Sequence, residues 1–135
     1  MELTGEMLLP GEASGPLLRL TAPISFWGGV DPQTGTIADP RHPQAGARLA
    51  GRVLVVGRTR GSSSSSAVML ELIHAGLAPA ALVLGEVDAI LVLGCLVARE
   101  MGWPPPPVLR LDAAALAAMP DAGPARLAGG RLLLG

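Results

Sequence analysis

The sequence predicts an α/β fold, a small β-barrel or sheet flanked by two to three helices, and three observations support this class. Short apolar runs bounded by glycine or proline occur at residues 51–57, 80–85 and 108–112, and each is typical of a buried strand. Segments with helical spacing of apolar residues separate these runs, at 62–75 and 87–102. This alternation favours parallel strands joined by right-handed crossovers. The length of 135 residues fits one domain.

The N-terminal part is predicted to be less regular. Residues 1–16 are expected to form an irregular arm, because a Pro-Gly pair and a Gly-Pro pair interrupt them, and one short strand at its start stays open as an alternative. A first strand is predicted within 17–27, where leucines alternate with polar residues. Residues 28–46 are dense in Gly, Pro and Asp, so we expect turns there around a short strand-like piece at 36–38.

Both central helices have recognisable ends. Gly76 follows the first and Gly102 follows the second, and glycine is a natural helix stop. Asp88 lies early in the second helix, where an acidic side chain favours the N-terminus. The β-rich residues 89–93 leave a strand open as an alternative.

The C-terminal part is predicted to return to the sheet. The prolines at 103–107 exclude a helix there. A short helix is predicted at 113–119 and a closing strand at 129–135.

Charge and composition exclude several classes of protein. All ten basic residues are arginine and the net charge is −1, which argues against a nucleic-acid-binding face. The longest apolar stretch, 87–98, is too short to span a bilayer and contains Asp88. No leader-like segment precedes the domain, so we expect a soluble, cytoplasmic protein without a membrane contact.

A run of five serines, residues 62–66, lies at the junction between the strand at 51–57 and the helix after it. A flexible linker is a poor interpretation, because two apolar elements enclose the run. Helix capping needs one serine oxygen, so Ser62 or Ser63 as N-cap accounts for only one residue of the five.

An anion-binding site accounts for more of this junction. The N-terminus of a helix presents unpaired N–H groups and the positive end of its dipole. Gly61 lets the backbone approach a ligand closely. Arg58 and Arg60 can bind carboxylate or phosphate through paired hydrogen bonds. The junction is therefore predicted to bind a small anionic substrate.

Two familiar motifs are absent from this junction. A nucleotide P-loop needs a lysine, and an α/β-hydrolase nucleophile needs G-x-S-x-G; the chain has neither. A Ser–His dyad that uses His42 or His74 stays open, although the spacing gives it no support.

Four short motifs occur together: G-G-x-D-x-x-T-G at 28–35, H-P at 42–43, G-S-S at 61–63 and A-P-A at 78–80. Together they resemble the small subunit of the aconitase X family over residues 15–135. The resemblance implies a swivelling β/β/α domain.

The same resemblance implies roles for the serine junction. Ser62 matches the serine that accepts the substrate proton, and Gly61 and Ser63 match the rest of the anion-binding turn. Ser64 stands where the aconitase branch of the superfamily has an arginine, and we count it with the substrate-binding residues. Arg58 and Arg60 are predicted from the junction alone.

Members of this family are hydro-lyases, so the resemblance implies a dehydratase subunit. One type dehydrates cis-3-hydroxy-L-proline and is typical of bacteria; another dehydrates mevalonate 5-phosphate and is typical of archaea. We favour the first because an arginine-rich, lysine-free composition is typical of a high-GC coding sequence. The rival hypothesis from another class is a non-catalytic anion-binding module.

The family also implies a large subunit that carries an iron centre, either an iron–sulfur cluster or a single iron. A cluster takes three or four thiolates, and Cys95 is the only cysteine, so no metal is expected on this chain.

Two further candidates lie in the turn-rich segment. Asp31 belongs to the turn-like sequence DPQTG, which is more typical of a structural turn than of a substrate loop. His42 precedes Pro43 in a loop that is expected to flank the junction.

Overall fold

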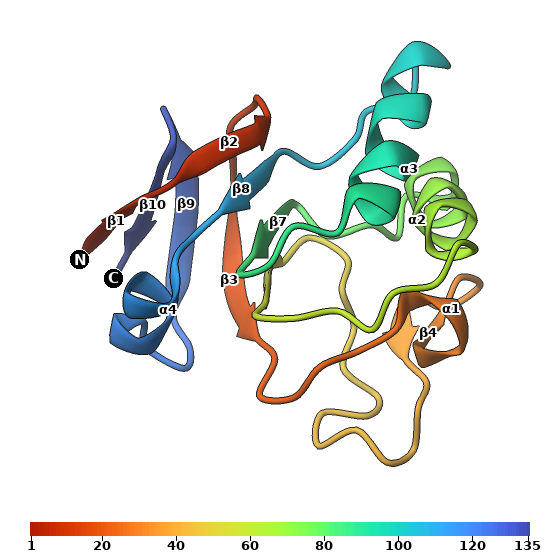
Figure 1. The fold of residues 1–135 in the computed structure, drawn as a ribbon, viewed down its shortest axis with the longest axis horizontal. Coiled ribbons are helices and arrows are strands. Elements are labelled where there is room, and N and C mark those ends of the chain that lie inside the picture. Colours follow the sequence, from red (N-terminus) through yellow and green to blue (C-terminus); the bar gives the residue numbers. More distant parts are fainter.

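The computed structural model describes all residues, 1–135, as a main sheet of eight strands, a small sheet of two and four helices (Figure 1). The strands are β1 (Glu2–Thr4), β2 (Glu6–Leu9), β3 (Ala13–Arg19), β4 (Val30–Asp31), β5 (Thr36–Ile37), β6 (Val53–Val56), β7 (Ala81–Leu84), β8 (Val108–Arg110), β9 (Pro124–Ala128) and β10 (Arg131–Leu134). The helices are α1 (Phe26–Gly29), α2 (Ser65–Ala75), α3 (Ala89–Glu100) and α4 (Ala113–Ala118).

The main sheet closes into a small barrel through its N-terminal residues. The strand order is β1-β10-β9-β3-β6-β7-β8-β2, so β1 and β2 occupy the two edges. Only Gly5 separates them in the sequence, so one extended segment supplies both edge strands and pairs with β10 and with β8. A side chain at Gly5 would collide with the carbonyl oxygen of Arg110, so only glycine fits this crossing point.

The expected irregular arm over 1–16 was wrong, because these residues form three strands. Their partners are distant in the sequence: Glu2 pairs with Leu133 and Glu6 pairs with Arg110. Pro16 is accommodated opposite Pro124, where β3 runs antiparallel to β9. Such long-range pairs leave no local periodicity to detect.

The central strands are parallel, as predicted, and are buried on both faces. Every residue of β6 and β7 is buried. Val53 and Val55 face the barrel interior, whereas Leu54 and Val56 belong to the larger core beneath the helices. This two-sided burial explains why the sequence shows continuous apolar runs rather than alternation.

Helices cover two parts of the barrel (Figure 1). The predicted helices at 62–75 and 87–102 form as α2 and α3, which pack against each other on one face of the sheet, although α2 begins only at Ser65. Residues 89–93 are helical, so the alternative strand does not form. The predicted helix at 113–119 forms as α4, where Leu116 packs against the barrel interior.

Three segments differ from the sequence prediction. The strand expected at 17–27 begins earlier and ends at Arg19, and the chain then turns through α1. β9 was missed, and the predicted strand at 129–135 is a hairpin turn followed by β10. Gly129 and Gly130 form that turn, and both have positive φ.

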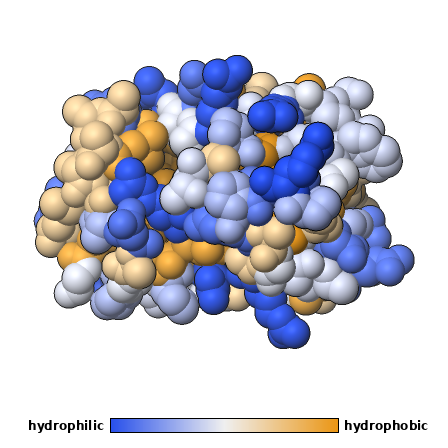
Figure 2. Space-filling model, turned by 90° about the horizontal axis from the view of Figure 1, so that it is seen from below, coloured by the Kyte–Doolittle hydropathy of each residue, from blue (hydrophilic) through white to orange (hydrophobic).

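None of the helices is long and apolar enough to cross a bilayer. Figure 2 shows the face seen from below as a mixture of hydrophilic and apolar residues, with apolar ones gathered on the side where α4 lies. That helix buries none of its residues fully, and its alanines at 113, 114, 117 and 118 are exposed.

Candidate functional site

The serine run lies in the connection from β6 to α2. This connection leaves the sheet at the carboxyl end of a parallel strand, where α/β folds place their ligands. Its backbone is fixed: the N–H of Arg60 donates to the carbonyl oxygen of Ile24 at 2.9 Å, and Thr59 pairs with Ile24 as an isolated bridge. The serines thus follow a fixed segment, which a flexible linker would not provide.

The start of α2 leaves backbone donors free. The hydroxyl oxygen of Ser62 accepts a hydrogen bond from the backbone N–H of Ser64 at 3.3 Å. The N–H of Ser65 donates to the carbonyl oxygen of Ser62 at 3.1 Å. No side chain caps this helix, and the N–H groups of Ser66 and Ala67 have no acceptor. Free N–H groups at a helix start are suited to an anion.

The five serines do not share one role. Residues 62–64 are exposed or half-buried. Ser65 is only 1% exposed, and its hydroxyl oxygen has no partner. The backbone of Ser66 touches α3 at Gly94, where an added Cβ would lie 2.6 Å from the Ser66 carbonyl oxygen. Small side chains late in the run therefore suit packing, whereas the earlier ones stay accessible at the surface.

The two arginines before the serines have different surroundings. Arg58 is exposed and lies 4.0 Å from Glu86, an exposed ion pair that contributes little to stability. Arg60 has no carboxylate partner. It lines a pocket of about 660 Å³. The structure thus places Arg60 in a pocket and Arg58 outside it.

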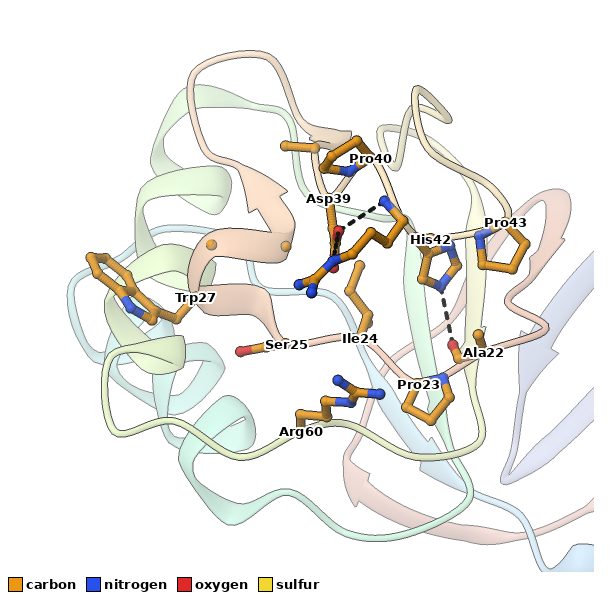
Figure 3. A pocket seen from close by; sticks show the side chains of 14 residues that line it. Ala22, Pro23, Ile24, Ser25, Trp27, Asp39, Pro40, His42, Pro43 and Arg60 are labelled. Atoms are coloured by element: carbon orange, nitrogen blue, oxygen red, sulfur yellow. Dashed lines mark hydrogen bonds and ion pairs between the residues drawn. The ribbon is translucent and has the colours of Figure 1, made fainter.

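Three segments form this pocket (Figure 3): residues 22–29, residues 38–43 and Arg60. Figure 3 shows Asp39 and Arg60 on opposite sides, with the Arg60 side chain extending into the space between. Trp27 stands at one end and is 61% exposed. The lining of the pocket includes the charged side chains of Asp39, Arg41 and Arg60.

His42 is fixed by its own surroundings. Its ring Nε2 lies 3.1 Å from the carbonyl oxygen of Ala22, and its Nδ1 accepts the backbone N–H of Gln44 at 3.0 Å. These two bonds place the proton on Nε2 in a neutral ring. Both ring nitrogens are hydrogen-bonded and only 8% of the residue is exposed, so His42 forms part of the pocket wall.

A second pair of residues organises the same wall. Asp39 accepts two hydrogen bonds from Arg41 through its Oδ1, one from the backbone N–H at 3.0 Å and one from Nε at 3.3 Å. The backbone bond is the main cause that lowers the pKa of the Asp39 carboxyl, so Asp39 stays ionised.

Comparison with known proteins then places the chain. A family model described as the aconitase X swivel domain matches residues 2–133. The chain belongs to this family. The crystal structure of aconitase X from Thermococcus kodakaraensis in its holo form is 28% identical, with a TM-score of 0.86 and coverage of 99% of this chain and 98% of that one.

Two curated relatives of this swivel domain carry activity names. A cis-3-hydroxy-L-proline dehydratase of Pseudomonas aeruginosa is 47% identical over 131 residues, which are 94% of this chain and 22% of the relative. A phosphomevalonate dehydratase small subunit of Methanopyrus kandleri is 49% identical over 73 residues, which are 54% of each chain. The chain therefore spans about a fifth of the first and about half of the second.

Within the swivel domain, Gly61 lines a second pocket, of about 330 Å³, between the serine connection and the start of α3. There the Thr59 hydroxyl donates to Oδ2 of Asp88 at 2.7 Å. Sequence analysis missed this bond: Asp88 was recognisable at a helix start, but nothing local identifies Thr59 as its partner. Arg41 and Asp39 were missed for the same reason.

Asp31 is not part of either pocket. Its Oδ1 accepts the backbone N–H of Gln33 at 2.9 Å, which closes the turn between β4 and β5. Asp31 thus has a structural role in this fold, as the turn-like sequence around it favours.

The residues of this chain do not fit an iron centre. No three His, Cys, Asp or Glu side chains gather closely enough to hold a metal ion. Cys95 is buried in the core, and burial raises the pKa of its thiol to about 12. A buried neutral thiol is a poor metal ligand, because metals bind the thiolate.

Proposed function

We propose that this swivel domain is the small subunit of an aconitase-type hydro-lyase that removes water from cis-3-hydroxy-L-proline. The named relatives support the dehydratase class, and the proline-type relative matches 94% of this chain. Dehydration of mevalonate 5-phosphate is the second candidate, because a small subunit of that name is 49% identical over 73 residues.

Ser62 is proposed as the base that takes the proton from the carbon next to the substrate carboxylate. The observation that carries this assignment is the hydrogen bond from the Ser64 N–H to the Ser62 hydroxyl oxygen. A serine hydroxyl is a weak base, and its deprotonated form needs local stabilisation. A backbone donor aimed at that oxygen, at the positive end of α2, supplies it.

The proposed reaction balances without another reagent. The proton moves to the deprotonated Ser62 oxygen, and the C–H electron pair becomes the new C=C bond. The C–O bond of the β-hydroxyl breaks as that oxygen takes up a proton from solvent and leaves as water. Ser62 then returns its proton to solvent, so the net change is the loss of one water. Gly61, Ser63 and Ser64 are proposed to bind the substrate through the open start of α2. Arg60 is proposed to bind its charged group in the larger pocket. Arg58 pairs with Glu86 outside that pocket and is proposed to lie at the edge of the substrate site.

The partner remains part of the proposal. We propose a large subunit that carries the iron centre and faces the serine connection, since this chain has no group of residues suited to iron. The P. aeruginosa relative is a single chain in which this domain matches only 22%, which leaves room for such a partner segment. The cytoplasmic location expected from the sequence stays a prediction.

The test is co-expression of this chain with its large subunit, followed by assay of both substrates for water loss. We expect turnover of cis-3-hydroxy-L-proline, and we expect Ser62→Ala to lower kcat by at least about 100-fold. Ser14→Ala, an exposed serine on β3, is the matched control and should behave as wild type. Size-exclusion chromatography should show the same complex for all three proteins.

Other outcomes would point elsewhere. A Ser62→Ala complex with near-normal kcat would remove Ser62 as the base. Turnover of mevalonate 5-phosphate alone would favour the second candidate. A chain that binds no large subunit would favour the non-catalytic anion-binding module.

A further inference from the structure

We propose that Arg41 and Arg60 together form the carboxylate-binding site of this enzyme, within the pocket of about 660 Å³. The inference rests on the proposed dehydratase function and extends it by a residue, Arg41, that neither motif nor junction identifies. Both candidate substrates carry a carboxylate on the carbon that loses its proton. A carboxylate site close to the base is therefore required for either.

Backbone hydrogen bonds build the pocket as one unit. The N–H of Ala38 donates to the carbonyl oxygen of Gly29 at 2.8 Å, which attaches the 38–43 segment to the 22–29 segment. His42 attaches the other end through Ala22. Arg60 is attached to the same floor, since its N–H donates to the carbonyl oxygen of Ile24. The two arginines are thus carried by segments that these bonds attach to one another.

The side chain of Arg41 is held in a defined direction. Asp39 accepts from its Nε at 3.3 Å, which leaves the two terminal amino groups of the guanidinium without a partner. The Arg41 side chain is 88% exposed, so these groups are available. Asp39 acts here as a positioning residue, because it orients Arg41 and does not itself bind the substrate.

The charge of the pocket favours an anion. Its ionised lining residues are Asp39, Arg41 and Arg60, one negative and two positive, which gives a net charge of +1. The ring of His42 is neutral in its hydrogen-bonding arrangement. Arg60 has no acidic partner. One oxygen of a carboxylate can then bind each guanidinium, or one guanidinium can bind both oxygens.

The position of the site agrees with its proposed use. Arg60 precedes Ser62 by two residues, so the proposed base directly follows the segment that Ile24 fixes and that carries the proposed carboxylate contact. Loss of the proton sends negative charge onto the carboxylate, and two guanidinium groups would stabilise that charge as it develops. The pair should therefore affect kcat as well as KM.

The test uses the assembled complex and three arginine variants. Arg41→Ala should lower kcat/KM by about 10- to 100-fold, and Arg41→Lys should restore only part of it, because lysine cannot form the paired bond. Arg48→Ala is the matched control, since Arg48 is exposed, makes no ion pair and lies outside the pocket. It should leave kcat/KM unchanged.

A second measurement separates recognition from folding. L-Proline and L-prolinamide differ only in the carboxylate, and the wild-type complex should be inhibited more strongly by the acid. Arg41→Ala should reduce this preference by about 10-fold while leaving inhibition by the amide unchanged. A merely structural residue would change both inhibition constants together.

The outcomes distinguish this inference from the function on which it rests. If the wild-type complex dehydrates neither substrate, the proposed function fails, and this inference with it. If the wild type is active and Arg41→Ala matches Arg48→Ala, the inference alone is wrong. It is also wrong if Arg41→Ala prevents assembly, because the pocket would then be a contact with the large subunit.

Discussion

Helices α2 and α3 begin at the same end of the parallel strands, yet their first turns are built differently. Asp88 caps α3, since its Oδ1 accepts the backbone N–H groups of Ile90 and Leu91 at 3.1 Å. Ser64, at the same position of α2, makes no side-chain cap. A side-chain cap provides acceptors for the first N–H groups of a helix within the protein, whereas an uncapped start leaves these N–H donors free for a ligand.

The capped helix also positions the uncapped one. Asp88 uses its second oxygen to accept the hydroxyl of Thr59, three residues before Ser62. Further along, Gly94 of α3 touches the backbone of Ser66. α3 therefore contacts the serine connection both before and after the exposed serines. The first N–H groups of α3 bind Asp88 and are not free for a ligand. Four substitutions test this division of roles.

The largest effect is expected from Gly94→Ala. Helix propensity alone predicts a gain of about 0.5–1 kcal/mol in the free energy of unfolding. The added Cβ would instead meet the Ser66 backbone, and separating the helices should cost about 1–3 kcal/mol. Urea unfolding measures the sign directly, with the exposed neighbour Leu93→Ala as control. A stabilised Gly94→Ala variant would show that the helices do not need this close contact.

Asp88→Ala is expected to be next. It removes the α3 cap, at a cost of about 0.5–2 kcal/mol, and also leaves the Thr59 hydroxyl without its acceptor. Asp88→Asn keeps an effective capping oxygen and should lose less. Thermal and urea unfolding of both variants would check this order, and equal losses would assign the effect to charge rather than capping.

Thr59→Val should have a smaller effect on stability and a clear effect on turnover. The change keeps the shape and deletes one hydrogen bond, which is worth about 0.5–1.5 kcal/mol. Because this bond holds the connection that carries Ser62, kcat of the assembled complex should fall while Thr59→Ser retains it. Normal kcat in Thr59→Val would mean that the bond does not position the base.

Ser64→Ala should have the smallest effect on folding. Its side chain caps nothing, so the free energy of unfolding should change by less than about 0.5 kcal/mol. Set beside Asp88→Ala in the same urea titration, this variant compares the two helix starts directly. A loss as large as that of Asp88→Ala would contradict the distinction between them.

Local patterns predicted the part of the fold in which each element carries its own signal. The run from β6 to β8 was recognisable because apolar strands and helix-spaced segments alternate over 51–112. The N-terminal strands were not, because the order of Glu2 and Glu6 comes from partners more than 100 residues away. Pro and Gly in that segment suggested irregular structure, yet they occupy the crossing point, a turn and an antiparallel pair.

The candidate site divides in the same way. The serine junction could be found because Gly61 and the serines are contiguous, and contiguous residues at a helix start share one surface. Arg41 could not, because it reaches the pocket through a loop closed by His42 and Gln44. The two hydrogen bonds at the ring nitrogens of His42 could not be predicted from the sequence either, so sequence analysis left His42 a candidate with an open role.

The closure of the barrel sets an order on how the protein can fold during synthesis. Within this domain residues 2–9 are made first, but β2 has no partner until β8 has been made and β1 has none until β10 has been made. Between those times the parallel strands and their helices can assemble around the larger core, which draws almost entirely on residues 9–108. We therefore expect the barrel to close last, when the first-made strand of the domain pairs with its last-made strand, because pairings so distant in sequence form slowly.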